Sequence, residues 1–223
     1  MLKSEDLFDL TFTIARALFL KCKYPFEIFP MLGKFIEELG TELDCETFSN
    51  PSRGIWIAKS ASVCKTAMIY PPCIIDDGAE VRHCAFIRGR AIIGKGAILG
   101  NSCEIKNAIM LDDAKAPHFN YCGDSILGHG AHMAAGTITS NVKADGGNIT
   151  IYSETERIES GMKKLGALIG DNAEIGCGTV LSPGTVIGKG ARIYPLSFVR
   201  GSVPDGAIYK SKSEICEILN ERK

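Results

Sequence analysis

The sequence predicts an all-β solenoid, namely a left-handed parallel β-helix of six-residue repeats with an N-terminal helical cap and a short C-terminal helix. One observation is a run of aliphatic residues at every sixth position: Ile57, Val63, Ile69, Ile75, Val81, Ile87, Ile93, Leu99 and Ile105. Another is a small residue four positions after each of the first eight: Ala61, Ala67, Cys73, Ala79, Ala85, Ala91, Ala97 and Cys103. A strict period of six belongs to neither an isolated strand nor a helix. It is typical of a triangular coil in which three repeats make one full turn.

The same register returns in two later segments. The expected inward residues there are Tyr121, Leu127 and Met133, and then Ile169, Ile175, Leu181, Ile187 and Ile193. Together with the first run they make seventeen repeats, or nearly six turns. Because each turn contacts only its neighbours, both ends of the coil need a cover.

Helices are expected to supply these covers. Residues 1–50 are predicted to form a helical cap, residues 51–205 the β-helix and residues 206–223 a C-terminal helix. An amphipathic helix is expected after Ser4, with one apolar face made of Leu7, Leu10, Ile14 and Leu18. A second helix is expected from about Pro30 to Leu39, ended by Gly40. The closing helix is expected from Ser211 to Arg222.

Composition excludes several classes of function. The formal net charge is −1 and no basic block is interleaved with aromatic residues, so a nucleic-acid partner is not expected. The N-terminus lacks the pattern of a signal peptide, and its apolar stretch is too short and too charged to cross a membrane. The nine cysteines are an odd number without a C-x-x-C pair, which indicates reduced thiols of a cytoplasmic protein.

Two interruptions of the period are candidate functional segments. From Leu111 to Tyr121 the period of six is broken, which predicts a loop that leaves the coil and carries residues 115–120. From Ser140 to Ala167 the chain contains Gly146 and Gly147 followed by an alternating apolar stretch, which predicts a projecting arm or hairpin at 140–167. Loops held by a rigid scaffold commonly carry binding and catalytic residues.

Spacing also brings two cations together. Arg88 and Lys106 are three repeats apart, which is one full turn, and each directly follows an inward aliphatic residue. They are therefore expected one above the other on the same wall, with backbones roughly 5 Å apart. An anion between them would relieve their repulsion, which predicts a phosphate site. The alternative is that the two side chains splay apart, or pair with Glu104 or another acid.

His118 is the candidate catalytic residue, because an imidazole titrates near neutrality and can take a proton from an amine that attacks an activated acyl group. The alternative is an ordinary surface histidine. The other histidines, His83, His129 and His132, invite comparison with zinc sites. The spacing of His129 and His132 within one repeat points their side chains in different directions, so no metal is expected.

The segment that contains these residues resembles a known enzyme. Arg88, Glu104 to Lys106, the run 115–124 (Lys-Ala-Pro-His-Phe-Asn-Tyr-Cys-Gly-Asp) and the run 134–141 (Ala-Ala-Gly-Thr-Ile-Thr-Ser-Asn) are similar to the acetyltransferase half of the bifunctional N-acetylglucosamine-1-phosphate uridyltransferase and glucosamine-1-phosphate acetyltransferase. The whole chain, with Pro183 to Gly188 and Val203 to Lys210, resembles stand-alone UDP-N-acetylglucosamine pyrophosphorylase-related proteins.

The resemblance implies a role for each matching residue. It implies that His118 is the general base for the 2-amino group of a sugar, and that three residues bind the sugar phosphate: Arg88, Lys106 and Tyr121. Further residues would line the sugar site: Asn101, Glu104 and His132. Acetyl-CoA, the co-substrate, would lie in a groove between subunits near five residues: Ala135, Asn141, Cys177, Pro195 and Lys210. The amine would attack the thioester directly. A triangular prism with flat walls packs around a threefold axis, and the cofactor groove is shared by neighbouring subunits, so a homotrimer is predicted.

The sequence also departs from that pattern. Some fifty largely helical residues stand where the family has a nucleotide-binding domain, so uridylyl transfer is not expected. His132 replaces an asparagine that contacts the sugar, and the arm at 140–167 is longer than in the family. The acceptor could therefore be a phosphorylated amino sugar, another sugar or a nucleotide sugar. A non-catalytic sugar-nucleotide-binding subunit is the remaining alternative.

Overall fold

The computed structural model describes residues 2–153, 156–211 and 214–217, and it is a parallel β-helix with three walls. Wall A contains β2 (Ile55–Ala58), β5 (Cys73–Ile75), β8 (Ala91–Ile93), β11 (Ala108–Met110), β14 (Ile126–Leu127), β19 (Ala167–Ile169), β22 (Thr185–Ile187) and β25 (Ser202–Val203). Wall B contains β3 (Ser62–Val63), β6 (Glu80–Val81), β9 (Ile98–Asn101), β12 (Lys115–His118), β15 (His132–Met133), β20 (Glu174–Ile175), β23 (Arg192–Ile193) and β26 (Ala207–Ser211). Wall C contains β4 (Met68–Ile69), β7 (Phe86–Ile87), β10 (Glu104–Lys106), β13 (Tyr121–Gly123), β16 (Ile138–Thr139), β21 (Val180–Leu181) and β24 (Phe198–Val199).

The left-handed β-helix predicted from the period of six is confirmed. The aliphatic residues of the first run that lie between Ile75 and Ile105 are buried inside the prism. The coil is longer than the seventeen recognised repeats indicated, with about eight turns rather than nearly six. The extra turns come from segments whose register the period did not detect.

The expected loop at 115–120 does not leave the coil. Residues 115–118 form β12, which pairs with β9 and β15 in wall B. The period of six breaks here because some turns are one residue shorter than three full repeats, so that Glu104 pairs with Tyr121 and Ile105 with Cys122. Cys122 therefore points inward and Tyr121 points outward, which reverses the prediction for Tyr121.

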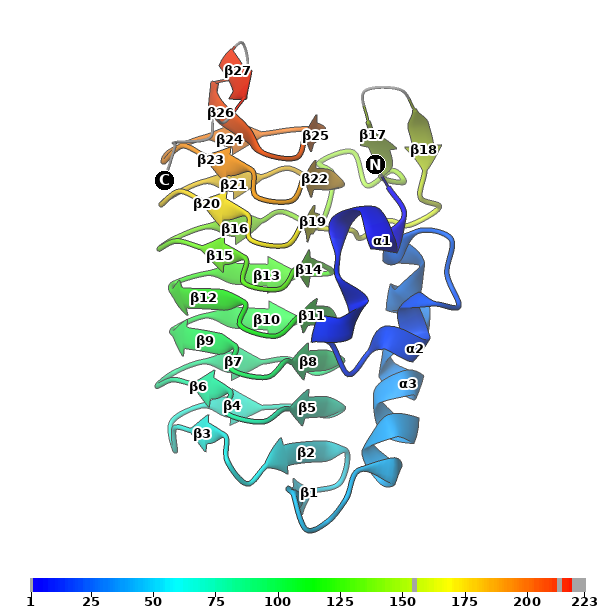
Figure 1. Cartoon of the computed structure of the whole chain (residues 1–223), viewed down its shortest axis with the longest axis vertical. Coiled ribbons are helices and arrows are strands. Elements are labelled where there is room, and N and C mark those ends of the chain that lie inside the picture. Colours follow the sequence, from blue (N-terminus) through cyan, green and yellow to red (C-terminus); the bar gives the residue numbers. More distant parts are fainter. Residues whose placement is uncertain (1, 154–155, 212–213, 218–223) are drawn as a thin grey trace.

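The N-terminal helices lie along wall A instead of over the first coil (Figure 1). They are α1 (Ser4–Leu7), the 3-10 turn η1 (Leu10–Phe12), α2 (Arg16–Phe19), the 3-10 turn η2 (Pro25–Ile28) and α3 (Phe29–Glu42). Their apolar residues pack on outward side chains of wall A, which are fully buried: Ile74, Ile92, Ile109, Ile126, Leu168 and Val186. The helical cap of residues 1–50 is thus a flank, and β1 (Phe48–Ser52) pairs antiparallel with β2 at the first edge.

Two details of these helices differ from the prediction. The first helix is broken into short pieces, and the N-cap of α1 is Lys3. Gly40 does not end α3, which continues to Glu42. A side chain at Gly40 would collide with the Trp56 ring, so this glycine serves close packing rather than termination.

The C-terminal segment also differs from the expected helix over residues 206–223. Within its described part, β26 continues wall B and β27 (Glu214–Glu217) folds back antiparallel on it. The rest of the expected helix, at 212–213 and 218–223, lies outside the described residues. The predicted arm, in contrast, is confirmed as a hairpin, because β17 (Thr150–Tyr152) pairs antiparallel with β18 (Arg157–Glu159).

Candidate functional site

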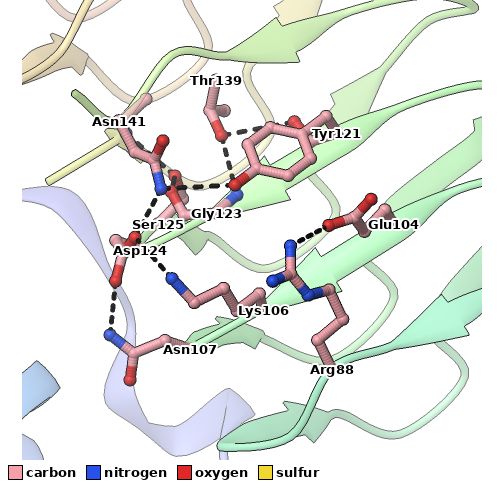
Figure 2. A network of polar contacts seen from close by, with 11 residues as sticks. Arg88, Glu104, Lys106, Asn107, Tyr121, Gly123, Asp124, Ser125, Thr139 and Asn141 are labelled. Carbon is pink, nitrogen blue, oxygen red and sulfur yellow. Dashed lines mark hydrogen bonds and ion pairs between the residues drawn. The ribbon is translucent and has the colours of Figure 1, made fainter. Parts of the chain in front are cut away.

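Wall C carries the candidate phosphate residues at one edge. Parallel pairing of β7 with β10 aligns Ile87 with Ile105, so the next residues, Arg88 and Lys106, stand one above the other as the sequence predicted. Each cation is paired with an acid, which was the alternative considered. Arg88 Nη1 lies 2.6 Å from Glu104 Oε1, and Lys106 Nζ lies 3.7 Å from Asp124 Oδ2 (Figure 2).

A ladder of three polar residues supports Lys106 from the adjacent corner. Asn107 and Asp124 are buried, and Asn141 is half-buried one turn farther along. Asp124 accepts hydrogen bonds from Asn107 Nδ2 at 2.7 Å and from Asn141 Nδ2 at 2.5 Å (Figure 2). The carboxylate therefore joins one ion pair and two hydrogen bonds, which fixes the surrounding side chains. The side-chain oxygen of Asn107, Oδ1, has no hydrogen-bond partner within the described part of the chain.

Tyr121 belongs to the same network. Its phenol oxygen accepts a hydrogen bond from Asn141 Nδ2 at 3.3 Å, which leaves the phenol proton for another partner. Burial, with the charges of Asp124 and Glu104, raises the pKa of Tyr121. The phenol is therefore a neutral hydrogen-bond donor at physiological pH. Asn141 therefore lies beside the phosphate residues, at one edge of wall C. The residues that were expected to bind acetyl-CoA together with it lie at the opposite edge.

His118 lies at the corner between walls B and C, at the end of β12. Its backbone pairs with Asn101, and its side chain is exposed. The buried Asn120 holds the corner: its Oδ1 accepts from the His118 N–H at 3.1 Å and its Nδ2 donates to the Ala134 oxygen at 2.7 Å. No described residue forms a hydrogen bond with the His118 imidazole, so the ring is free to meet a ligand.

The expected cofactor-side residues form a column along this corner. Gly136 N–H donates to the His118 oxygen, Gly178 N–H to the Ala135 oxygen and Leu196 N–H to the Cys177 oxygen. The column therefore runs in order from the histidine toward the C-terminal turns: His118, Ala135, Cys177 and Pro195. Lys210 lies close to its end, with Nζ 5.9 Å from the centre of the Tyr194 ring.

His132 is not brought to this site. It projects from wall B, where its backbone pairs with Lys115, and its Nδ1 lies 2.9 Å from Glu174 Oε2. His129 is stacked on Phe12, with ring centres 3.8 Å apart. Among the described residues no group of three or more histidine, cysteine or acidic side chains could hold a metal ion. In the same residues no helix is long and apolar enough to cross a membrane.

Two cysteines near the site are part of the core. Cys103 and Cys122 are both about 1% exposed. Burial raises the pKa of both thiols, so they are protonated and shielded from a bound ligand.

Asp124 and Asn107 were not among the site residues predicted from the sequence. Both residues have φ near +47°, a left-handed conformation that asparagine and aspartate tolerate better than most residues. The signal that could have found them is an even spacing, because Asn107, Asp124 and Asn141 follow one another at intervals one residue short of three full repeats.

Comparison with known proteins identifies the repeat. Residues 166–201 match the family model described as bacterial transferase hexapeptide (six repeats). Within these residues the chain carries bacterial transferase hexapeptide repeats. It is 33% identical over 126 residues to a bifunctional sugar-1-phosphate nucleotidylyltransferase/acetyltransferase of Sulfurisphaera tokodaii, which covers 56% of this chain and 31% of that protein. It is 31% identical over 177 residues to the bifunctional protein GlmU of Methanococcus aeolicus, covering 71% of this chain and 43% of that protein.

The chain thus spans less than half the length of these two relatives, and it resembles the C-terminal acetyltransferase half of GlmU. Among solved structures, a mutant of AntD, an N-acyltransferase from Bacillus cereus in complex with dTDP and coenzyme A, matches with a TM-score of 0.41 and 16% identity. That match covers 79% of this chain and 92% of AntD.

Proposed function

We propose that this protein is an acetyl-CoA-dependent N-acetyltransferase that acts on a phosphorylated amino sugar similar to glucosamine-1-phosphate. The observation that carries the proposal is the stacking of Arg88 on Lys106 at one edge of wall C, with His118 at the other edge. Sequence similarity to relatives named as acetyltransferases supports the same conclusion.

The phosphate of the acceptor binds between Arg88 and Lys106. Arg88 uses Nη1 for Glu104, and the guanidinium has further N–H donors for an anion. The 3.7 Å separation between Lys106 and Asp124 is an ion pair rather than a short hydrogen bond, so the ammonium also keeps donors for the ligand. Tyr121 donates its phenol proton to the same phosphate, and Glu104 and Asn101 line the sugar.

His118 acts as the general base. It accepts a proton from the amino group as the nitrogen attacks the thioester carbonyl carbon, and a backbone N–H stabilises the resulting oxyanion. Collapse of that intermediate breaks the carbon–sulfur bond and releases CoA, whose sulfur takes up a proton. No acyl-enzyme forms, in keeping with the burial of Cys103 and Cys122.

Acetyl-CoA lies along the corner column that starts at His118. Neighbouring strands are about 4.8 Å apart, so the three steps from His118 to Pro195 extend over roughly 14 Å. An extended cofactor arm along Ala135, Cys177 and Pro195 would bring its thioester to the imidazole and its far end toward Lys210.

A cytoplasmic homotrimer completes the site. From β4 to β16 the first outward column of wall C is largely apolar and uncovered, unlike wall A, which the helices bury: Met68, Phe86, Glu104, Tyr121 and Ile138. Met68 and Ile138 are 55% and 40% exposed. An apolar wall of this kind favours contact with a second copy, and a closed ring of three copies would put each site in a shared groove.

The test is acetyl transfer itself. Release of free CoA is measured with purified protein, acetyl-CoA and glucosamine-1-phosphate, against glucosamine and glucosamine-6-phosphate at equal concentrations. We expect the anomeric phosphate to give the highest kcat/KM. Absence of CoA release with every amino sugar and nucleotide-linked amino sugar would instead support a non-catalytic binding subunit.

A further inference from the structure

A hollow of about 460 Å³ lies between the arm and the last turns of wall C. Its lining comes from the start of the arm, from β17, and from β21, β24 and the residues that follow these two strands. Its volume lies in the range of small-molecule sites. The roles proposed for acetyl transfer leave this hollow unused.

The arm is anchored, so the hollow is preformed. Ile149 and Ile151 are fully buried and pack in the same cluster as Val186 of wall A. The Ile149 N–H donates to the Met162 oxygen at 2.8 Å, and Ser202 Oγ donates to the Tyr152 oxygen. Figure 1 shows the hairpin of β17 and β18 beside β22 and β25, at the opposite end of the coil from β1.

The lining combines aromatic and cationic side chains. Tyr152 and Phe198 are 41% and 63% exposed, which leaves ring faces available for stacking. Arg200 is exposed and has no hydrogen-bond or ion-pair partner among the described residues, whereas Lys143 pairs with Asp145 at 3.1 Å. Two cations and one carboxylate give the lining a net charge of about +1. Exposed rings beside a guanidinium with free donors fit a planar base that carries phosphate.

The hollow lies close to the phosphate residues of the candidate site along the chain and across the strands. Ser140 lines the hollow, and the next residue, Asn141, contacts the Tyr121 phenol. Gly123 lies one strand beyond Lys106, and Ser140 one strand beyond Gly123. Two strand spacings separate the backbones of Lys106 and Ser140 by roughly 10 Å. One extended ligand can therefore reach from Lys106 into the hollow.

We infer that the hollow binds the nucleoside of a nucleoside diphosphate sugar together with the phosphate attached to that nucleoside. The phosphate attached to the sugar lies at Arg88 and Lys106. This inference rests on the proposed function and specifies its acceptor as a nucleotide-linked amino sugar. The base stacks on Phe198 and Tyr152, and Arg200 binds the phosphate attached to the nucleoside. The arm at 140–167, which is longer than in the family, thus helps to recognise the acceptor.

The test begins with binding in the absence of acetyl-CoA. Isothermal titration of the full chain with UDP, dTDP, GDP and ADP is expected to give a dissociation constant below about 1 mM for at least one of them. Arg200→Ala and Phe198→Ala are each expected to weaken that binding by tenfold or more. The control is Arg192→Ala, which removes an exposed arginine from wall B and should bind as the wild type does.

Competition and turnover separate the possible outcomes. Displacement of the bound nucleotide by 3′,5′-ADP, the phosphoadenosine part of coenzyme A, would assign the hollow to the cofactor and overturn the inference, as would binding of none of the four nucleotides. Wild-type transfer to glucosamine-1-phosphate is measured in parallel. Transfer without nucleotide binding would refute this inference and leave the proposed function, whereas nucleotide binding without transfer to any amino sugar would refute the function.

Discussion

The side chains of Asp124 and Asn141 are joined across one turn of the coil by a 2.5 Å hydrogen bond, and the same carboxylate contacts Lys106 and Asn107. Asp124 is 3% exposed, so its environment offers little water to replace a lost contact. This carboxylate thus positions the residues that would hold the acceptor.

Replacement of Asp124 tests that role. In Asp124→Asn, a single amide oxygen must accept the contacts that the two carboxylate oxygens accept in the wild type. The new NH₂ group then faces another donor. We expect a loss of about 1–3 kcal/mol in the free energy of unfolding and a KM for the acceptor raised by tenfold or more. The matched control is Asp113→Asn, since Asp113 has the same left-handed backbone and an exposed side chain. Equal effects of both changes on KM would contradict a positioning role.

Loss of either stacked cation should weaken acceptor binding specifically. We expect Arg88→Ala and Lys106→Ala to raise the KM for glucosamine-1-phosphate at least tenfold, because each removes charge-assisted hydrogen bonds worth about 1.5–3 kcal/mol. The KM for acetyl-CoA should stay within threefold. Arg82→Ala is the control, as Arg82 is paired with Glu80 on wall B. A rise in the KM of both substrates, or of neither, would argue against a phosphate site.

Light scattering tests the apolar wall. At micromolar concentration the protein should have a mass of about three times 24.0 kDa. Met68→Asp introduces a charge into the first outward column of wall C and should shift the protein toward monomer. Ser62→Asp on wall B should not. A wild-type monomer would remove the shared-groove model.

The helical flank makes a prediction about stability. Ile92 is 0% exposed because α3 covers it, although it points out of the prism. Ile92→Ala should therefore cost about 2–5 kcal/mol, like a core substitution. Ile98, which points outward from wall B without a helix over it, should cost less than about 1 kcal/mol when changed to alanine. Urea denaturation compares the two, and equal costs would argue against the docked helices.

The period of six predicted the prism but not its local register. It fails after Ile105, where the next inward residue is Met110 rather than Leu111. The sequence alone could not show that Met110 rather than Leu111 points inward, because Ile109, Met110 and Leu111 are all apolar. Ile109 is buried under the helical flank. A wall covered on both faces loses the alternation that reveals which residues point inward.

The site shows the same mixture of success and failure. The stacking of Arg88 on Lys106 followed from spacing, because the turn that joins these residues contains three complete repeats. Pairing with Glu104 was the alternative considered from the sequence, and Arg88 makes that contact. Asp124, which pairs with Lys106, and the ladder through it lie at shortened corners that the period did not detect. His132 was assigned by resemblance; it lies within wall B beside Lys115 and is paired with Glu174, whereas His118 lies at the end of its strand, at the corner with wall C.

The most direct test of the account compares two histidines at the same corner. His83 and His118 are both exposed and lie two turns apart. His118→Ala should lower kcat for acetyl transfer to the preferred amino-sugar acceptor by about 10²–10⁴-fold, with both KM values within a few-fold and an unchanged melting temperature. His83→Ala should turn over at the wild-type rate. Wild-type turnover by a correctly folded His118→Ala protein would contradict the proposed base and the mechanism built on it.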